Sequence, residues 1–515
     1  MKIHDIKTLG ELKKSGYKSL TVKDELRKNL VEKIRNKENT FPGIIGYEDS
    51  VIPDTERAIL SRHNILFLGL RGQAKTRMAR QMTQLLDEYI PVIQGSEIND
   101  DPFNPLSKYA KNQIAQHGDD TPVTWLHRSE RYGEKLATPD VSVADLIGDI
   151  DPIKAANLRL SFADEHVIHY GIIPRSNRSI FVINEIPDLQ ARIQVALFNI
   201  LEEGDIQIRG FKLRMPLDIM FVFTANPEDY TNRGSIVTPL KDRIQSQILT
   251  HYPKDIETSL SITEQEAHIL EDQKMINVSD LVKRLIEQIA FEARNNEYVD
   301  KKSGVSARLT IAAFENAVSS AERRAIIHGE KDTIVWISDL AGIIPSITGK
   351  IELVYEGEQE GPYQVALNLL DKAIRSQFIT YFPNPELLKK RKSTGKASQA
   401  QKDDDPYREI TKWFDKGNHL DMFIDMKDAD KIKALYKVEG LYGITKKHFP
   451  HASEKESALL MEFVLHGLAA YSLISKKTIE GKIQFKDLIG SMMNLSQFSS
   501  SEEDDNDIFN EDDYK

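Results

Sequence analysis

The sequence predicts an α/β protein in which a parallel β-sheet is followed by helical regions. Apolar runs typical of buried strands lie at residues 64–68, 179–183 and 219–223. Segments with helical spacing of apolar residues separate these runs, and strands that alternate with helices indicate a parallel sheet. From about residue 255 to 382 the pattern is helical throughout. Weaker strand candidates lie at 91–93 and 123–126.

Composition narrows the function classes. The 515 residues are enough for roughly two to four domains. Acidic residues outnumber basic ones by 79 to 68, and a formal net charge of −11 argues against bulk affinity for nucleic acid or an anionic membrane. The chain has no cysteine, so disulfides and thiolate metal sites are excluded. We find no signal-peptide pattern and no membrane-length apolar run, and therefore expect a cytoplasmic protein without a membrane span.

The segment GLRGQAKT, residues 69–76, joins the first apolar run to a helix-favouring stretch. Strand, glycine-bearing loop and helix are the context of a phosphate-binding loop, in which backbone N–H groups surround a phosphate. Lys75 is expected to reach the β- and γ-phosphates of ATP, and the Thr76 hydroxyl is expected to bind Mg²⁺. The candidate nucleotide-binding residues here are Gly69, Gly72, Gln73, Ala74, Lys75 and Thr76.

One position departs from the usual loop pattern, which has glycine just before the lysine. Ala74 stands there. Alanine fits if the local backbone stays at a negative φ and nothing crowds the phosphate.

Polar residues follow the other two apolar runs where each strand ends. Asn184 and Glu185 follow the second run, and Asn226 follows the third. Ligands bind at the carboxyl ends of strands in an open parallel sheet, so these side chains are expected beside the phosphate loop. Glu185 can polarise a water for attack on the γ-phosphate, and Asn226 can hold that water or touch the phosphate.

Two arginines complete the candidate site. Arg243 follows a turn-rich segment and is placed in sequence to reach a neighbouring subunit as an arginine finger, although Arg233 competes for this role. Arg308 lies in the helical part and could sense the γ-phosphate from there.

Together these residues resemble those of an AAA+ ATPase, and within that class the magnesium-chelatase I-subunit and MoxR branch. The resemblance covers about residues 43–351, more than half of the chain. The matching segments are the first nucleotide motif at 69–76, the second motif at 180–185, the edges of a helix-two insert at 145–148 and 171–174, and a β-hairpin at 205–216. Asn226 matches the sensor-one position, Arg243 the finger and Arg308 the sensor-two arginine.

The resemblance implies an AAA+ P-loop parallel-sheet domain with a helical lid. The expected organisation is an N-terminal helical extension at 1–40, an α/β nucleotide-binding domain at 41–254, a helical lid at 255–388, a linker at 389–405, an additional C-terminal helical region at 406–495 and an acidic disordered tail at 496–515. It also implies a homo-oligomeric ring, typically a hexamer, that hydrolyses ATP with Mg²⁺ and remodels a partner protein. In related proteins that partner commonly carries a von Willebrand factor A domain.

The second motif differs from the family pattern at one residue. The family has aspartate before the glutamate, where this chain has Asn184. An amide accepts a hydrogen bond from a metal-bound water but brings no charge, so we expect weaker Mg²⁺ binding or slower turnover. Two alternatives stay open: the motor subunit of a magnesium or cobalt chelatase, and an ATP-binding assembly switch with little hydrolysis.

Overall fold

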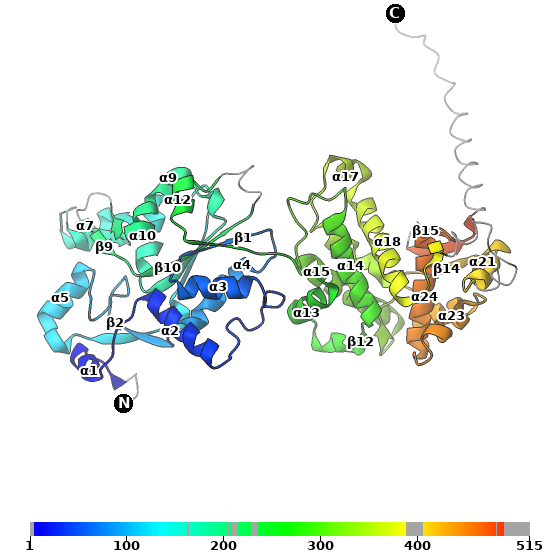
Figure 1. The fold of residues 1–515 in the computed structure, drawn as a ribbon, viewed down its shortest axis with the longest axis horizontal. Coiled ribbons are helices and arrows are strands. Elements are labelled where there is room, and N and C mark those ends of the chain that lie inside the picture. The colour runs from blue at the N-terminus through cyan, green and yellow to red at the C-terminus, as the bar shows by residue number, and fades with distance from the viewer. Residues whose placement is uncertain are drawn as a thin grey trace, which may run out of the picture. The chain divides into compact units, whose positions relative to one another are not determined.

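The computed structural model describes residues 5–161, 164–203, 205–208, 214–227, 235–387, 405–479 and 481–488. The chain divides into two compact units, Met1–Pro253 and Lys254–Lys515, which we describe one at a time (Figure 1). Nearly all of the predicted linker, and the whole predicted acidic tail, lie outside the described residues. None of the helices in the described part of the chain is long and apolar enough to cross a membrane.

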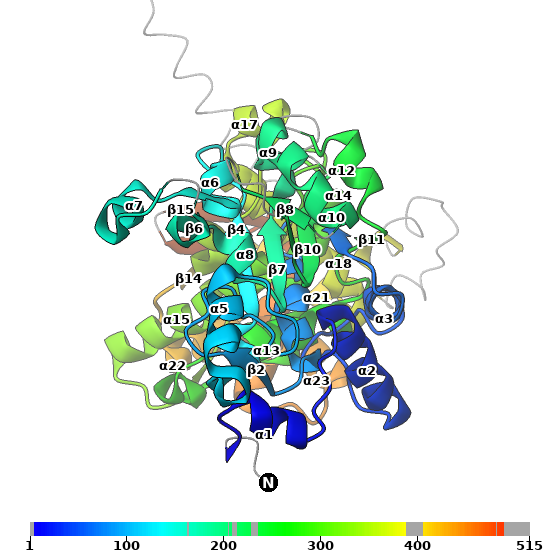
Figure 2. The same ribbon diagram turned by 90° about the vertical axis from the view of Figure 1, so that its left-hand side faces the viewer.

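A five-stranded parallel sheet forms the centre of the first unit. Its strands are β1 (Ile65–Leu68), β4 (Tyr132–Leu136), β7 (Ser179–Asn184), β10 (Ile219–Ala225) and β11 (Ser246–Leu249). Their spatial order is β11-β1-β10-β7-β4, and every neighbouring pair is parallel. In sequence order this is 5-1-4-3-2, the order of an AAA+ P-loop module, and the predicted fold class is confirmed. Figure 2 shows β4, β7 and β10 beside one another.

Alternate residues of the central strands belong to two different hydrophobic cores. Phe67, Val182 and Val222 face a core with residues of α2, α3 and α4, whereas Phe181 and Phe223 face a core with residues of α9, α10 and α12. The helices are α2 (Val22–Arg35), α3 (Val51–Leu60), α4 (Lys75–Gln81), α9 (Ala191–Ala196), α10 (Phe198–Glu203) and α12 (Thr238–Asp242). Because both faces are covered, the strands read as continuous apolar runs.

The N-terminal segment, predicted as an extension, contributes to this core. Helix α1 spans Leu9–Lys14, and α2 buries Leu26 and Leu30 under the sheet. Glu25 of α2 forms a buried ion pair with Arg131, with Nη1–Oε1 and Nη2–Oε2 distances of 2.7 Å. Removing one partner would leave an unpaired buried charge, so this pair ties α2 firmly to the sheet domain.

The two weaker strand candidates pair with each other and stay outside the central sheet. They are β2 (Tyr89–Ile93) and β3 (Val123–His127), which form an antiparallel pair. The predicted hairpin is confirmed by β8 (Asp205–Gln207) and β9 (Arg214–Pro216). The remaining elements of this unit are α5 (Lys108–His117), α6 (Val143–Leu146), β5 (Gly148–Ile150), α7 (Pro152–Leu158), β6 (Ile168–Tyr170) and α8 (Ile172–Arg175).

The second unit is mainly helical. Its helices are α13 (Ile256–Glu266), α14 (Asp280–Asn295), α15 (Arg308–His328), α16 (Ile344–Thr348), α17 (Tyr355–Glu360), α18 (Pro362–Tyr381), α21 (Arg408–Asp415), α22 (Asp428–Tyr436), α23 (Leu441–His448) and α24 (Glu454–Ala470). Its strands are β12 (Ile276–Asn277), β13 (Thr333–Ile334), β14 (Leu420–Phe423), β15 (Ser475–Ile479) and β16 (Lys482–Lys486). The last three form an antiparallel sheet in a region predicted as helical.

The segments before and after the predicted linker share one hydrophobic core. Phe378 of α18 lies with its ring centroid 5.6 Å from that of Phe463 and 6.0 Å from that of Tyr407. Gly467 of α24 has no room for a Cβ because the Phe378 ring occupies that space. Buried Glu462 of α24 also accepts hydrogen bonds from the backbone N–H groups of residues 337 and 338, at 2.9 and 3.0 Å.

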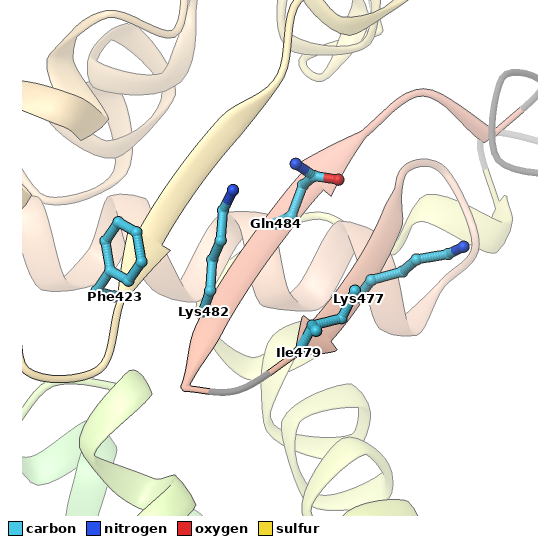
Figure 3. Close-up of a pocket in the computed structure, with 5 residues that line it drawn as sticks. All are labelled: Phe423, Lys477, Ile479, Lys482 and Gln484. Atoms are coloured by element: carbon cyan, nitrogen blue, oxygen red, sulfur yellow. The ribbon is translucent and has the colours of Figure 1, made fainter.

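A groove of about 290 Å³ lies on the three-stranded sheet of this unit. Figure 3 shows its lining residues, which are Phe423, Lys477, Ile479, Lys482 and Gln484. No residue of the predicted nucleotide site is among them.

Candidate functional site

The phosphate loop is fixed in place by the end of β10, by Thr250 just after β11 and by Tyr47. Gly69 donates from its N–H to Ala225 O at 3.1 Å, and a Cβ at this position would overlap the Thr250 side chain. Thr250 donates to Oε1 of buried Gln73 at 2.6 Å. Tyr47 donates from its hydroxyl to Gln73 O at 2.9 Å. These contacts hold the loop backbone before any phosphate binds.

Ala74 does not have the negative φ at which alanine fits without strain. Its φ is 53° and its ψ is 16°, in the left-handed region, while the nearby Gly72 has a φ of 72°. The turn from the loop into α4 imposes this conformation, which explains why glycine is the usual residue here. An alanine in this region costs about 1–2 kcal/mol.

Lys75 directs its ammonium group into the loop. The side chain is only 7% exposed, and Nζ donates to the carbonyl oxygens of Gly69 and Leu70 and to Asn226 Oδ1, the last at 2.6 Å. A buried ammonium is costly unless it is paired or hydrogen-bonded, so a phosphate group is a fitting partner for it.

Asn226 joins Lys75 to Glu185. Its Nδ2 donates to Glu185 Oε2 at 3.1 Å, while its Oδ1 accepts from Lys75. Glu185 also has a left-handed backbone, with a φ of 53°, and its N–H donates to Thr224 Oγ1 at 3.1 Å. The structure therefore brings together three residues that the sequence placed at three different strand ends.

Asn184 lies on the other side of the loop and faces Thr76. Its Oδ1 accepts from Thr76 Oγ1 at 3.3 Å and from Thr224 Oγ1 at 3.0 Å. Its Nδ2 donates to Glu134 Oε1 at 2.6 Å. A carboxylate can only accept, so the amide nitrogen must face Glu134 and the amide oxygen must face the hydroxyls.

Glu134 is a site residue that the sequence reasoning missed. It lies on β4, and its Oε2 accepts from Arg80 Nε at 3.1 Å, Arg80 Nη2 at 2.9 Å and Tyr132 OH at 3.0 Å. The hydrogen bond to Glu134 raises the pKa of Arg80 above its ordinary value. The only signal in the sequence is a carboxylate in a weakly apolar segment, and that signal does not reveal a strand.

The oxygen atoms around Asn184 fit Mg²⁺. Thr76 and Asn184 provide a hydroxyl and an amide oxygen, which are hard donors of the kind that Mg²⁺ prefers, and the Glu134 carboxylate lies behind Asn184, hydrogen-bonded to its Nδ2. No group of three or more His, Cys, Asp or Glu side chains able to hold a metal ion occurs in the part of the chain that the structure describes. Mg²⁺ usually keeps several waters and binds substrate phosphates, so the phosphates of ATP would share its coordination here.

Arg243 and Arg308 are not brought to this cluster by contacts that the structure describes. Arg243, at the end of α12, pairs with Glu202 through Nη2 at 2.6 Å and lies 5.0 Å from the Phe198 ring centroid. Arg308 is the exposed first residue of α15 in the second unit. Arg233 lies outside the described residues. The roles of these arginines in a neighbouring subunit or through the lid remain predictions.

No model of a known protein family matches this sequence, and no curated protein matches it. A search of solved structures finds similar chains. A candidate ATPase from Cytophaga hutchinsonii is 18% identical over 70% of this chain and 97% of its own, with a TM-score of 0.28. A complex of the BchI and BchD subunits of magnesium chelatase is 17% identical over 62% of this chain and 98% of its own, with a TM-score of 0.32. A RuvB variant from Thermotoga maritima is 12% identical over 65% of this chain and 77% of its own, with a TM-score of 0.33. The fold assignment rests on the chain's own strand order and phosphate loop.

Proposed function

We propose that this chain is an AAA+ ATPase that binds ATP with Mg²⁺ and hydrolyses it to drive a mechanical task. The single observation that carries the proposal is the hydrogen-bonded series Lys75–Asn226–Glu185 at the end of the phosphate loop. It sets a buried cation, a polar amide and a carboxylate side by side at the carboxyl edge of a parallel sheet, where ligands bind.

Each residue has a separate task in this proposal. Lys75 exchanges its loop carbonyl contacts for phosphate oxygens, because a charged acceptor forms the stronger hydrogen bond. Glu185 accepts a proton at its carboxylate from the attacking water, and Asn226 Nδ2 holds that carboxylate in position. Mg²⁺, when bound, neutralises charge on the β- and γ-phosphate oxygens. Thr76 and Asn184 lie where they can hold it.

The finer assignment is to the magnesium-chelatase I-subunit and MoxR type of motor. It is supported by the 5-1-4-3-2 strand order, by the β8–β9 hairpin before β10 and by the small elements between β4 and β7. In this assignment the chain forms a homo-oligomeric ring and remodels or activates a partner protein with a von Willebrand factor A domain. The additional folded region after residue 405 is a natural place for such a partner to bind.

Replacing Glu185 with Gln tests hydrolysis. The amide cannot take the proton from water, so steady-state phosphate release is expected to fall about 10²- to 10⁴-fold. Affinity for a fluorescent ATP analogue should stay close to that of the wild type, because the proposed phosphate contacts come from the loop and Lys75, and the Gln side-chain oxygen can still accept from Asn226 Nδ2. A malachite-green phosphate assay and an equilibrium fluorescence titration measure the two quantities.

Lys75→Ala is the matched variant, and here nucleotide affinity itself should drop. If the wild type binds the analogue but releases no phosphate that depends on Glu185, the chain is an assembly switch and the motor is ruled out.

A trapping experiment with Glu185→Gln and ATP, followed by mass spectrometry of the captured proteins, then tests the partner. Recovery of proteins without a von Willebrand factor A domain would count against that partner class.

A further inference from the structure

The charge that the second nucleotide motif lacks at Asn184 is present on the neighbouring strand. We propose that Glu134 of β4 supplies the negative charge for the Mg²⁺ site, acting through Asn184 as a metal-positioning residue. This inference rests on the proposed function, because it concerns the metal that accompanies ATP.

The geometry places the carboxylate next to the amide. Glu134 is paired in register opposite Val182, two residues before Asn184 along β7, so both side chains lie at the same carboxyl edge of the sheet. Glu134 Oε1 and Asn184 Nδ2 are 2.6 Å apart, and Asn184 Oδ1 is 3.3 Å from the Thr76 hydroxyl. The Asn184 side chain thus bridges the Glu134 carboxylate, which its Nδ2 contacts, and the predicted metal ligand Thr76, which its Oδ1 contacts. A hydrogen bond from Nδ2 to a carboxylate polarises the amide and makes Oδ1 a better acceptor.

The pairing also explains why residue 184 is not aspartate. An aspartate there would put a second carboxylate within hydrogen-bond distance of Glu134, with no proton between them. Two carboxylates sharing a site repel, and one of them is forced to take up a proton. The pair Asn184 and Glu134 carries one negative charge, as an aspartate at position 184 beside a neutral residue would. The charge lies on β4 instead of β7.

Arg80 pairs with Glu134 but does not cancel its effect on the site. The Arg80 side chain is 63% exposed, whereas that of Glu134 is 24% exposed, so water screens the guanidinium charge more strongly. Arg80 and Tyr132 bind Oε2, which leaves Oε1 for Asn184. Their role is to hold the carboxylate in one orientation.

The test measures metal affinity without relying on turnover. Free Mn²⁺ is titrated against the full chain with a saturating non-hydrolysable ATP analogue and followed by electron paramagnetic resonance. Analogue affinity is measured in parallel by fluorescence, in EDTA and in Mg²⁺. Glu134→Gln is expected to weaken Mn²⁺ binding by about 10- to 100-fold, as loss of a metal-positioning partner does elsewhere. The double variant Glu134→Gln/Asn184→Asp should restore Mn²⁺ binding to within a few-fold of wild type.

Arg80→Gln separates a metal role from a structural one. It removes the same ion pair but keeps the carboxylate, so Mn²⁺ affinity should change far less than in Glu134→Gln. Equal losses in the two variants, or no recovery in the double variant, would overturn the inference. Unchanged Mn²⁺ affinity in Glu134→Gln would do the same. If the wild type binds no analogue in either EDTA or Mg²⁺, the proposed function fails first, and this inference falls with it.

Discussion

At the scale of single residues, the loop keeps its shape with an alanine where glycine is usual. Ala74 has a left-handed backbone, yet its side chain is half-buried against the core under the sheet. The methyl group therefore gains some packing, while the backbone carries strain. Strain held where the loop turns into α4 is a feature of ligand-binding sites, where the surrounding contacts fix a conformation that is costly by itself.

Ala74→Gly should stabilise the protein, because glycine adopts this backbone freely. After the loss of the methyl contacts and the higher chain entropy of glycine, we expect a net gain of about 0.5–1 kcal/mol in unfolding free energy. Urea denaturation followed by circular dichroism measures it. Ala79→Gly, in the same helix, is the control and should destabilise by about 1 kcal/mol or more, since Ala79 is buried within α4. A loss of stability in Ala74→Gly would contradict the strain assigned to this residue.

At the scale of elements, helix α2 begins on a half-buried carboxylate. Both carboxylate oxygens of Asp218, just before β10, accept from the backbone N–H of Val22, at 3.1 and 2.9 Å. Burial raises the pKa of Asp218 to about 6, against an ordinary value of 3.8. Between these values the folded protein holds a proton that the unfolded chain releases. The stabilising contribution is present below about pH 4 and is lost as the pH rises through 6.

Asp218→Asn should remove this pH dependence. The unfolding free energy of the wild type should fall relative to that of the variant as the pH rises from about 4 to 6, by at most about 1.4 kcal/mol per pH unit. Asp24, in the first turn of the same helix, gives the opposite control. A hydrogen bond from Thr21 lowers its pKa, so Asp24→Asn should cost stability above the ordinary pKa and less in acid. Parallel urea curves for wild type and Asp218→Asn across this range would disprove the assignment.

Strands that are covered on both faces could be predicted from the sequence, and edge strands could not. β7 and β10 are wholly buried and are rich in β-branched and aromatic residues. β4 is an edge strand that contains Gly133, Glu134 and Lys135, so its sequence has no apolar run. β11 is the other edge strand, and most of its residues are partly or fully exposed. Missing β4 also meant missing Glu134, because its role depends on a pairing between residues about fifty positions apart.

The candidate site divides in the same way. Lys75, Thr76, Asn184, Glu185 and Asn226 could be named in advance, since each follows directly on a recognisable strand or loop. The supports around them, such as Thr250 and Tyr47, carry no local pattern and are known only from tertiary contacts. The left-handed backbone of Ala74 was also hidden, because it is imposed by the path from β1 into α4.

At the scale of the whole molecule, the proposed ring predicts that each ATP site is built from two subunits. Arg243 pairs with Glu202 within its own chain, but its side chain is still 27% exposed. An exposed surface pair contributes little and can be exchanged for a stronger contact with a phosphate on a neighbour. The finger role assigned by resemblance requires such an exchange.

Mixing two inactive variants tests this arrangement. Arg243→Ala and Glu185→Gln should each lose most ATPase activity alone. We assume that the subunits of an equimolar mixture assemble at random in a head-to-tail ring. Roughly one interface in four then combines an intact Glu185 with a neighbour's intact Arg243, so about a quarter of the ATP sites should be active. Phosphate release at constant total protein measures the recovery. Glu202→Gln is the control and should keep activity, since it only frees Arg243.

Failure of the mixture to exceed the sum of its parts would place Arg243 outside the site. Size-exclusion chromatography with light scattering, carried out with ATP and Glu185→Gln, checks in the same samples that a ring has formed.

The core shared by α18 and α24 has a mechanical consequence for the proposed cycle. Phe378 occupies the space where Gly467 lacks a side chain, and Glu462 caps backbone groups near residue 337, so the predicted lid and the region after residue 405 are fastened by both apolar and polar contacts. A nucleotide-driven displacement of the lid would carry α21–α24 and the groove beside Phe423 with it, because these elements share one hydrophobic core with the lid helices. The lid and the region after residue 405 would then respond to nucleotide as one body.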